Sequence, residues 1–119
     1  MKILVVDDNQ GVASVTRLML EMEGHEVISA MNVSEGYRAY LKLRPELVIT
    51  DIQMPGENGF ELMNHIREQD PMIKAIYMSG NLSQFYAVLE TEKGLYPINY
   101  LDKPFSREEL MGQVSRFSS

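Results

Sequence analysis

Short apolar runs alternate along this chain with segments of helical apolar spacing, and this alternation constrains the fold more than any other feature. The expected strands span about 2–6, 25–30, 47–50, 73–78 and 98–101. The expected helices span roughly 10–23, 33–43 and 59–68, with a weaker helix through Leu82, Phe85, Val88 and Leu89 and a last one beginning at Ser106. Such alternation favours a parallel sheet with right-handed crossovers and helices on both faces. We therefore predict an α/β fold with a doubly wound, five-stranded parallel sheet.

The strand order cannot be read from the alternation itself. Small five-stranded folds of the flavodoxin-like type have the order 2-1-3-4-5, and by analogy we expect that order here. The strand order then reverses between strands one and three, and binding sites form in the crevice at such a switch point.

Apolar spacing and capping residues define the expected helices more closely. In the first helix the residues at helical spacing are Val12, Val15, Leu18, Met19 and Met22. In the second we expect Val33, Tyr37, Tyr40 and Leu41 to face inward, with Asn32 or Ser34 as the cap. Ser106 and Glu109 form a capping box for the last helix. The nine methionines are interpreted as residues that fill gaps in the core.

Composition narrows the class of protein. The 119 residues fit one domain, 1–119, and 45% hydrophobic residues suffice for a buried core. The net charge of -6 argues against a nucleic-acid or anionic membrane surface. There is no cysteine, no apolar run of transmembrane length and no signal-peptide pattern, so we expect a cytoplasmic domain.

Polar residues follow four of the expected strands at the points where the strands end. Asp7 and Asp8 follow the first strand, Asp51 the third, Ser79 the fourth and Lys103 the fifth. Because the carboxyl ends of parallel strands share one edge of a sheet, these side chains should converge. Three carboxylates cannot crowd together in ionised form without a cation. The pattern therefore predicts a Mg²⁺ site with a lysine beside it, which is typical of phosphoryl chemistry.

These motifs resemble the receiver domain of bacterial two-component response regulators, over nearly the whole chain. The matching residues are the acidic pair Asp7-Asp8, Asp51 with Met54-Pro55 and Gly59 after it, Ser79 followed by Gly80, Tyr100, and Lys103-Pro104-Phe105. Residues 90–97 depart from the family because they are longer than usual and lack its Gly-Ala pair, which leaves the geometry of the fourth helix open.

The resemblance implies a role for each of these residues. Asp51 would be the phosphoacceptor, and Lys103, joined to Pro104 by a cis bond, would hold a phosphoryl oxygen. The Mg²⁺ ligands would be Asp7, Asp8, Asp51 and the backbone carbonyl of Gln53. Ser79 and Tyr100 would form the conformational switch, and Gln53 and Asn81 would tune hydrolysis of the phosphoryl group.

The implied function is that of a signalling switch rather than a turnover enzyme. A phosphohistidine on a sensor histidine kinase or a phosphotransfer domain would donate to Asp51, and the domain would catalyse its own phosphorylation and dephosphorylation. The face formed by the fourth helix, fifth strand and fifth helix would then engage a downstream protein or output domain. No direct binding of nucleic acid or membrane is expected from this domain.

Three other functions are compatible with parts of the pattern. A receiver-like module could bind a partner without phosphorylation. A haloacid-dehalogenase-like phosphatase also uses an aspartate and Mg²⁺, but its nucleophile lies in an Asp-x-Asp motif after the first strand, where this chain has Asp7-Asp8-Asn9. A flavodoxin-like cofactor binder would need a Ser/Thr-rich phosphate loop after the first strand, which is absent. His25 and His65 have no paired spacing and are not expected to bind a metal.

Overall fold

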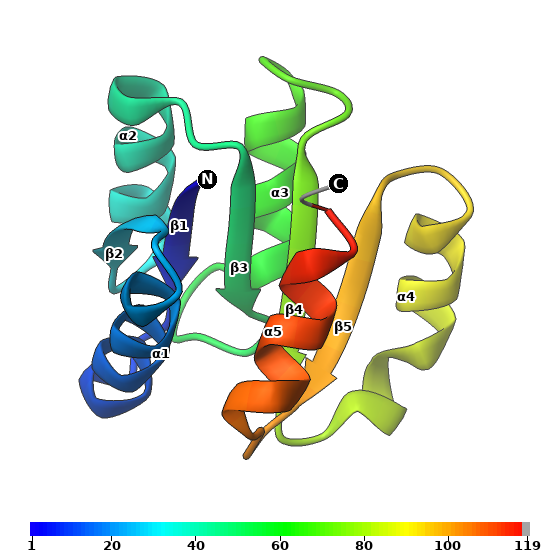
Figure 1. Ribbon diagram of the computed structural model, residues 1–119. Helices are drawn as coiled ribbons and strands as arrows, with labels where there is room; N and C mark the ends of the chain where they lie inside the picture. The colour runs from blue at the N-terminus through cyan, green and yellow to red at the C-terminus, as the bar shows by residue number, and fades with distance from the viewer. Residues whose placement is uncertain (118–119) are drawn as a thin grey trace.

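The central element is a five-stranded parallel sheet with the order β2-β1-β3-β4-β5 (Figure 1). The structure is a computed structural model and describes residues 1–117. Its strands are β1 (Lys2–Val6), β2 (Glu26–Ala30), β3 (Leu47–Asp51), β4 (Lys74–Ser79) and β5 (Ile98–Asp102). The predicted fold class and strand order are confirmed.

The register of the strands brings their carboxyl ends to one edge of the sheet. Val6 pairs with Thr50, Asp51 with Met78 and Ser79 with Asp102, all in parallel. Every residue of β3 is buried, as expected for the middle strand of a sheet that is covered on both faces. The residues that follow β1, β3, β4 and β5 therefore meet at the same edge.

Helices cover both faces of the sheet (Figure 1). They are α1 (Gln10–Met22), α2 (Val33–Leu43), α3 (Gly59–Arg67), α4 (Tyr86–Lys93), which follows a 3₁₀ turn η1 (Leu82–Phe85), and α5 (Arg107–Ser115). Leu20 of α1 and Leu110 and Val114 of α5 pack on one face, whereas α2, α3 and α4 contribute to the core on the other. Alternate residues of β1 enter the two cores, Ile3 and Val5 in one and Leu4 and Val6 in the other.

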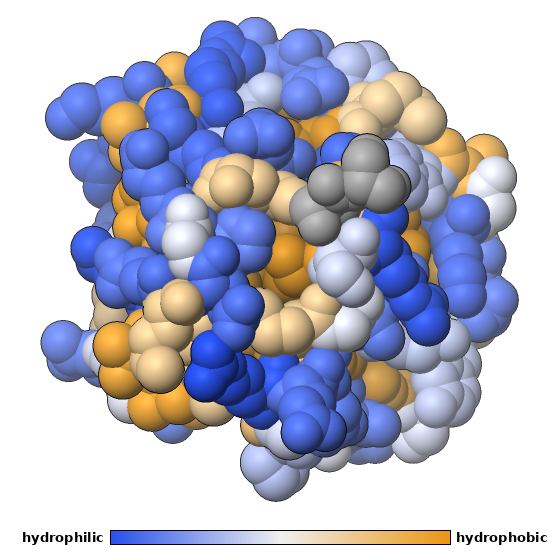
Figure 2. All heavy atoms as spheres, in the orientation of Figure 1, coloured by the Kyte–Doolittle hydropathy of each residue, from blue (hydrophilic) through white to orange (hydrophobic). Residues whose placement is uncertain are grey.

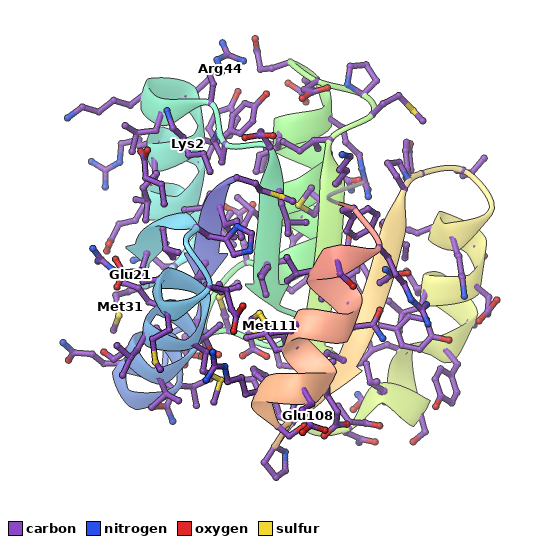
Figure 3. All side chains as sticks on the ribbon, viewed as in Figure 1. Lys2, Glu21, Met31, Arg44, Glu108 and Met111 are labelled. Atoms are coloured by element: carbon purple, nitrogen blue, oxygen red, sulfur yellow. The ribbon has the colours of Figure 1, made fainter. Side chains whose placement is uncertain are left out.

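Side-chain caps fix where most helices begin. Asn9, Asn32, Asn58 and Ser106 each accept a hydrogen bond from a backbone N–H in the first turn of the following helix. Asn32 is thus the cap of α2 rather than Ser34, and the capping box at Ser106 is confirmed. In Figure 3, Glu108 marks the start of α5 at the carboxyl edge of the sheet, whereas Lys2 and Arg44 lie at the opposite edge.

The apolar spacing predicted α1 correctly, but three of the five residues that carry this spacing are exposed. Val15, Leu18 and Met22 are 52%, 58% and 62% exposed, and the buried residues are Ala13, Thr16 and Leu20. Both sets have the spacing i, i+3, i+7, and at about 100° per residue they lie on nearly opposite faces of the helix. The small residues Ala13 and Thr16 face the sheet, which leaves the larger apolar stripe outside.

Two further expectations on burial were wrong in part. Leu41 of α2 is 40% exposed because the sheet-facing positions of this helix are Val33, Gly36 and Tyr40. In α4, Val88 is 45% exposed, whereas its neighbour Leu89 is buried. Among the methionines, Met63 and Met78 lie in the core, but Met22, Met31 and Met72 are exposed. Within residues 1–117 no helix is both long and apolar enough to cross a membrane.

Candidate functional site

Three carboxylates meet at the carboxyl edge of the sheet. Asp7 and Asp8 follow β1 and Asp51 ends β3, and one oxygen of each lies within 4.8 Å of those of the other two. Asp7 and Asp51 are buried and Asp8 is exposed. The predicted convergence of these residues is confirmed.

Asp7 is buried and held by two hydrogen bonds in this cluster. Its backbone N–H donates to the carbonyl of Ala30 at 3.1 Å, and its Oδ1 accepts a hydrogen bond from the N–H of Asn9 at 2.9 Å. Its Oδ2 is buried and receives no hydrogen bond of good geometry, although Lys103 Nζ lies 2.7 Å away. An anionic oxygen that is buried with unused lone pairs is suited to a metal cation.

Asp8 is free to bind a ligand, because another residue caps α1. Asn9 Oδ1 accepts the hydrogen bond from the N–H of Val12 at 3.1 Å, which is the bond that a capping aspartate would otherwise make. Within residues 1–117, neither a hydrogen bond nor an ion pair engages the Asp8 carboxylate. The set of donors, hard carboxylate oxygens of which one is exposed, fits Mg²⁺, which keeps several waters when it binds to proteins.

Asp51 ends the central strand, and hydrogen bonds fix the backbone at Asp51 and at the next residue. Thr50 Oγ1 donates to the Asp51 carbonyl at 3.0 Å, and Ile52 N–H donates to the carbonyl of Met78 at 2.9 Å. Gly59 closes the loop against this carbonyl so tightly that a Cβ atom there would lie 2.4 Å from it. Desolvation raises the pKa of Asp51 to about 6; the charge of Lys103 opposes the shift, and those of Asp7 and Asp8 add to it.

Lys103 joins two of the carboxylates. Its Nζ lies 2.7 Å from Asp7 Oδ2 and 3.2 Å from Asp51 Oδ1. Burial opposes its charge, but contact with Asp7 and the charges of Asp51 and Asp7 outweigh burial and raise its pKa. The bond between Lys103 and Pro104 is cis, as the resemblance implied. Lys103 is therefore the fixed positive charge of the site.

Ser79 is tied to both sides of the site. Its carbonyl accepts a hydrogen bond from the N–H of Lys103 at 2.9 Å, and its hydroxyl accepts one from the N–H of Asn81 at 2.9 Å. The side chain of Asn81 contacts Gln84 and Ser83 at 3.1 Å each. Gln53 is exposed and follows Asp51 by two positions. The structure thus places Ser79, the last residue of β4, beside Asn81 on the loop that follows.

Tyr100 is half-buried on the side of β5 that faces α4, where it packs against the edge of the core. Its hydroxyl donates to Glu90 Oε1 at 3.2 Å, and the Lys93 ammonium lies 5.6 Å from its ring centroid. The ring of Tyr86 is 6.1 Å away, centroid to centroid. Three residues of α4 therefore surround Tyr100, and their part in the site could not be inferred from motifs.

An apolar groove opens beside the site. It has a volume of about 590 Å³ and lies between α1, through Val12, Val15 and Met19, and the segment Lys103–Phe105. Figure 2 shows apolar surface in the hollow between α1 and α5. The exposed stripe of α1 is thus continuous with a groove that reaches Lys103.

The comparison with protein families agrees with this geometry. The family model of the response regulator receiver domain matches residues 3–115. The DNA-binding transcriptional regulator NtrC of Azospirillum brasilense is 37% identical over 114 residues, which are 96% of this chain but 23% of that protein. Sporulation initiation phosphotransferase F of Bacillus subtilis is 29% identical over 118 residues, which are 98% of this chain and 92% of that protein. The chain therefore spans less than a quarter of the NtrC relative and most of the phosphotransferase.

Solved structures show the same fold. The chemotaxis protein CheY4 of Vibrio cholerae superposes with a TM-score of 0.89 at 26% identity, over 98% of this chain and 97% of that one. The response regulator TrrA of Thermotoga maritima, solved in complex with Mg²⁺ and BeF, has a TM-score of 0.85 at 30% identity, over 98% of this chain and 97% of that one. With its acidic cluster, its sheet and this match over nearly its whole length, the chain belongs to the family of response regulator receiver domains.

Proposed function

We propose that Asp51 accepts a phosphoryl group, in a Mg²⁺-dependent reaction, from the phosphohistidine of a sensor histidine kinase or a histidine phosphotransfer domain. A receiver domain implies a partner of this kind in general. The observation that carries the proposal is the position of Asp51, whose carboxylate shares one cluster with Asp7 and Asp8 and lies 3.2 Å from Lys103.

In the proposed transfer an Asp51 oxygen attacks phosphorus, the P–N bond of phosphohistidine breaks, and its electron pair remains on the imidazole nitrogen. With its pKa at about 6, Asp51 is largely ionised at neutral pH and can act as the nucleophile. When bound, Mg²⁺ supplies positive charge for the phosphoryl oxygens, and we propose Asp7, Asp8, Asp51 and the backbone carbonyl of Gln53 as its ligands. Lys103 then exchanges its contact with Asp51 for one with a phosphoryl oxygen.

The hydroxyl of Ser79 couples phosphorylation of Asp51 to the conformational change. It accepts a hydrogen bond from Asn81 but keeps its own hydrogen to donate to a phosphoryl oxygen. Tyr100, which now lies against α4, turns inward into the space that Ser79 leaves. The face of α4, β5 and α5 changes as a result and engages a downstream protein or output domain.

Hydrolysis of the acyl phosphate returns the domain to its first state. Gln53 and Asn81 flank the approach of water, and neither is a general base. We expect self-dephosphorylation that is neither unusually fast nor blocked, together with self-phosphorylation from small donors. Replacement of Gln53 or Asn81 by Ala should change the rate of phosphoryl loss, followed by intact mass over time, and unchanged rates in both variants would remove them from this role.

The test is intact-mass measurement after incubation with acetyl phosphate and Mg²⁺. A gain of one phosphoryl group is expected for the wild type and for Asp102→Asn, a matched variant in which the aspartate at the end of β5 loses its charge. No gain is expected for Asp51→Asn or for wild type in EDTA. If neither acetyl phosphate nor a phosphohistidine donor labels the wild type, the chain is a receiver-like module that binds its partner without phosphorylation.

A further inference from the structure

A buried ionic cluster joins α4 to the rest of the molecule at one end only. Glu92 Oε1 accepts a hydrogen bond from Arg67 Nη2 of α3 at 2.9 Å and another from the hydroxyl of Tyr77 of β4 at 2.6 Å. The exposures of Glu92, Arg67 and Tyr77 are 9%, 7% and 0%. A single carboxylate oxygen thus connects three elements inside the protein.

The Arg67 guanidinium depends on Glu92 for its hydrogen bond to a carboxylate. The Arg67 guanidinium is covered by the Tyr96 ring, whose centroid lies 3.8 Å away, and within residues 1–117 its Nε and Nη1 have no hydrogen-bond acceptor. Burial and the Glu92 carboxylate raise the pKa of Tyr77, so its hydroxyl stays protonated and donates. Separation of Glu92 from Arg67 would leave charges unpaired away from water, which is strongly unfavourable.

The backbone N–H groups that follow α4 also have hydrogen-bond acceptors. The N–H groups of Leu95 and Tyr96 donate to the carbonyl of Glu92 at 2.9 and 2.8 Å, and that of Gly94 donates to the carbonyl of Glu90 at 3.3 Å. These bonds close the helix over the cluster. The end of α4 is therefore fixed by both side chains and backbone.

The beginning of α4 is held far less firmly. Neither Asn81 before η1 nor Phe85 before α4 makes a side-chain capping bond, and Tyr86 is 47% exposed. Asn81, Ser83 and Gln84 hydrogen-bond among themselves, and this end packs on the core through apolar contacts: Leu82 is buried, and the ring of Phe85 lies 6.0 Å from that of Phe60. Apolar contacts are not directional and permit sliding or rotation that an ionic cluster does not.

The two ends of α4 also lie at different distances from the chemistry. In Figure 1, η1 and the first turn of α4 lie at the carboxyl edge of the sheet, and α4 runs from there toward the opposite edge. Asn81, which precedes η1, donates to the hydroxyl of Ser79. Any displacement that starts at Ser79 therefore reaches the loosely held end first.

We propose that Arg67, Tyr77 and Glu92 form an anchor for the far end of α4, so that the response to phosphorylation is confined to η1 and the first turn of this helix. The inference rests on the proposed function, because it describes how that switch moves. Glu90 and Lys93, the neighbours of Tyr100, belong to the anchored part. Inward rotation of Tyr100 then breaks its bond to Glu90 and does not carry the helix with it.

Hydrogen-exchange mass spectrometry of the 119-residue chain, with and without Mg²⁺ and beryllofluoride as the phosphoryl substitute, tests this anchor. In the wild type, exchange in peptides over 80–88 should change on loading, whereas peptides over 90–96 should stay slow and unchanged. A change of similar size in both segments would overturn the anchor. Intact mass after acetyl phosphate, measured in parallel, reports the switch itself: without labelling, the proposed function fails and the anchor's signalling role fails with it.

Variants show whether the cluster causes the protection. Arg67→Met with Glu92→Leu replaces the charges by apolar groups of similar size, which keeps the core filled, and Tyr77→Phe removes one donor alone. Exchange over 90–96 should rise about tenfold in the double variant and should become sensitive to loading. The control Val88→Ala, an exposed change on the same helix away from the contacts of Tyr100, should leave this exchange as in the wild type. Wild-type protection in a folded double variant would show that other contacts hold the helix.

Discussion

Replacement of Gly59 by alanine tests how closely the loop after β3 is fitted to Asp51. The added Cβ would lie 2.4 Å from the Asp51 carbonyl oxygen, where a carbon–oxygen contact needs about 3.3 Å or more. The contact is with backbone, so α3 or the Asp51–Ile52 peptide must move by roughly 1 Å. Overpacking of this kind costs about 1–3 kcal/mol, against a helix-propensity gain of at most about 1 kcal/mol for alanine.

We therefore expect Gly59→Ala to lower the free energy of unfolding by about 2 kcal/mol and the Tm by roughly 8 °C. Gly112→Ala is the matched control, because Gly112 is an exposed residue within α5 and a Cβ there meets no atom within 4 Å. It should raise the free energy of unfolding by about 0.8 kcal/mol. Urea and thermal unfolding followed by circular dichroism measure both effects.

The two substitutions have the same chemistry and opposite expected signs, so the test does not depend on absolute stability. Gly59→Ala should also slow labelling of Asp51 by acetyl phosphate, because the displaced peptide carries the nucleophile. Equal shifts for the two variants, or a loss below about 0.5 kcal/mol for Gly59→Ala, would refute the reasoning, since surface substitutions already vary by that amount.

The other predictions concern charge in the site. The folded-state pKa of Asp51, about 6, exceeds the unfolded value of about 3.9. The folded protein thus binds more protons between these values, and its stability falls as pH rises through this window. In EDTA, Asp51→Asn should therefore be more stable than the wild type in urea unfolding, by a difference that grows from about pH 4 to pH 6 and then levels off. A difference that stays constant with pH would contradict this expectation. Mg²⁺ at about ten times its Kd should stabilise the wild type by about 1.4 kcal/mol; thermal melts should show most of this gain lost in Asp8→Asn and retained in Asp102→Asn. Lys103→Ala should leave some phosphorylation by intact mass but abolish the change in hydrogen exchange over 80–88, and loss of phosphorylation equal to that of Asp51→Asn would argue against separate roles.

The strand ends were predictable because two independent signals coincide there. Continuous apolar runs predict strands covered on both faces, and turn-forming or charged residues end each run, so Asp7, Asp51 and Lys103 could be placed at one edge without coordinates. The strand order came from analogy with small folds, and the register then follows from the parallel pairing. The positions of the strand ends depend only on short local segments, each of them an apolar run that ends in a turn-forming or charged residue.

Helix faces and side-chain networks were less predictable. The two apolar stripes of α1 have the same spacing, and only the packing of Ala13 and Thr16 against the sheet decides between them. Glu92 belongs to a charged run, 90–93, that is typical of a solvated helix, although its spacing from Phe85 and Leu89 would have placed it on the buried face. Its partner Arg67 lies on another helix, and no local pattern joins the two.

The full burial of β3 has a consequence for how the protein tolerates change. Amide groups of a central, fully enclosed strand exchange with solvent only when the whole molecule unfolds. Asp51 therefore belongs to the most persistent part of the fold, whereas the exposed residues of α1 and α4 can vary or fluctuate without displacing it. Sequence drift on these outer helices can alter which proteins are recognised while the position of the acceptor carboxylate is preserved.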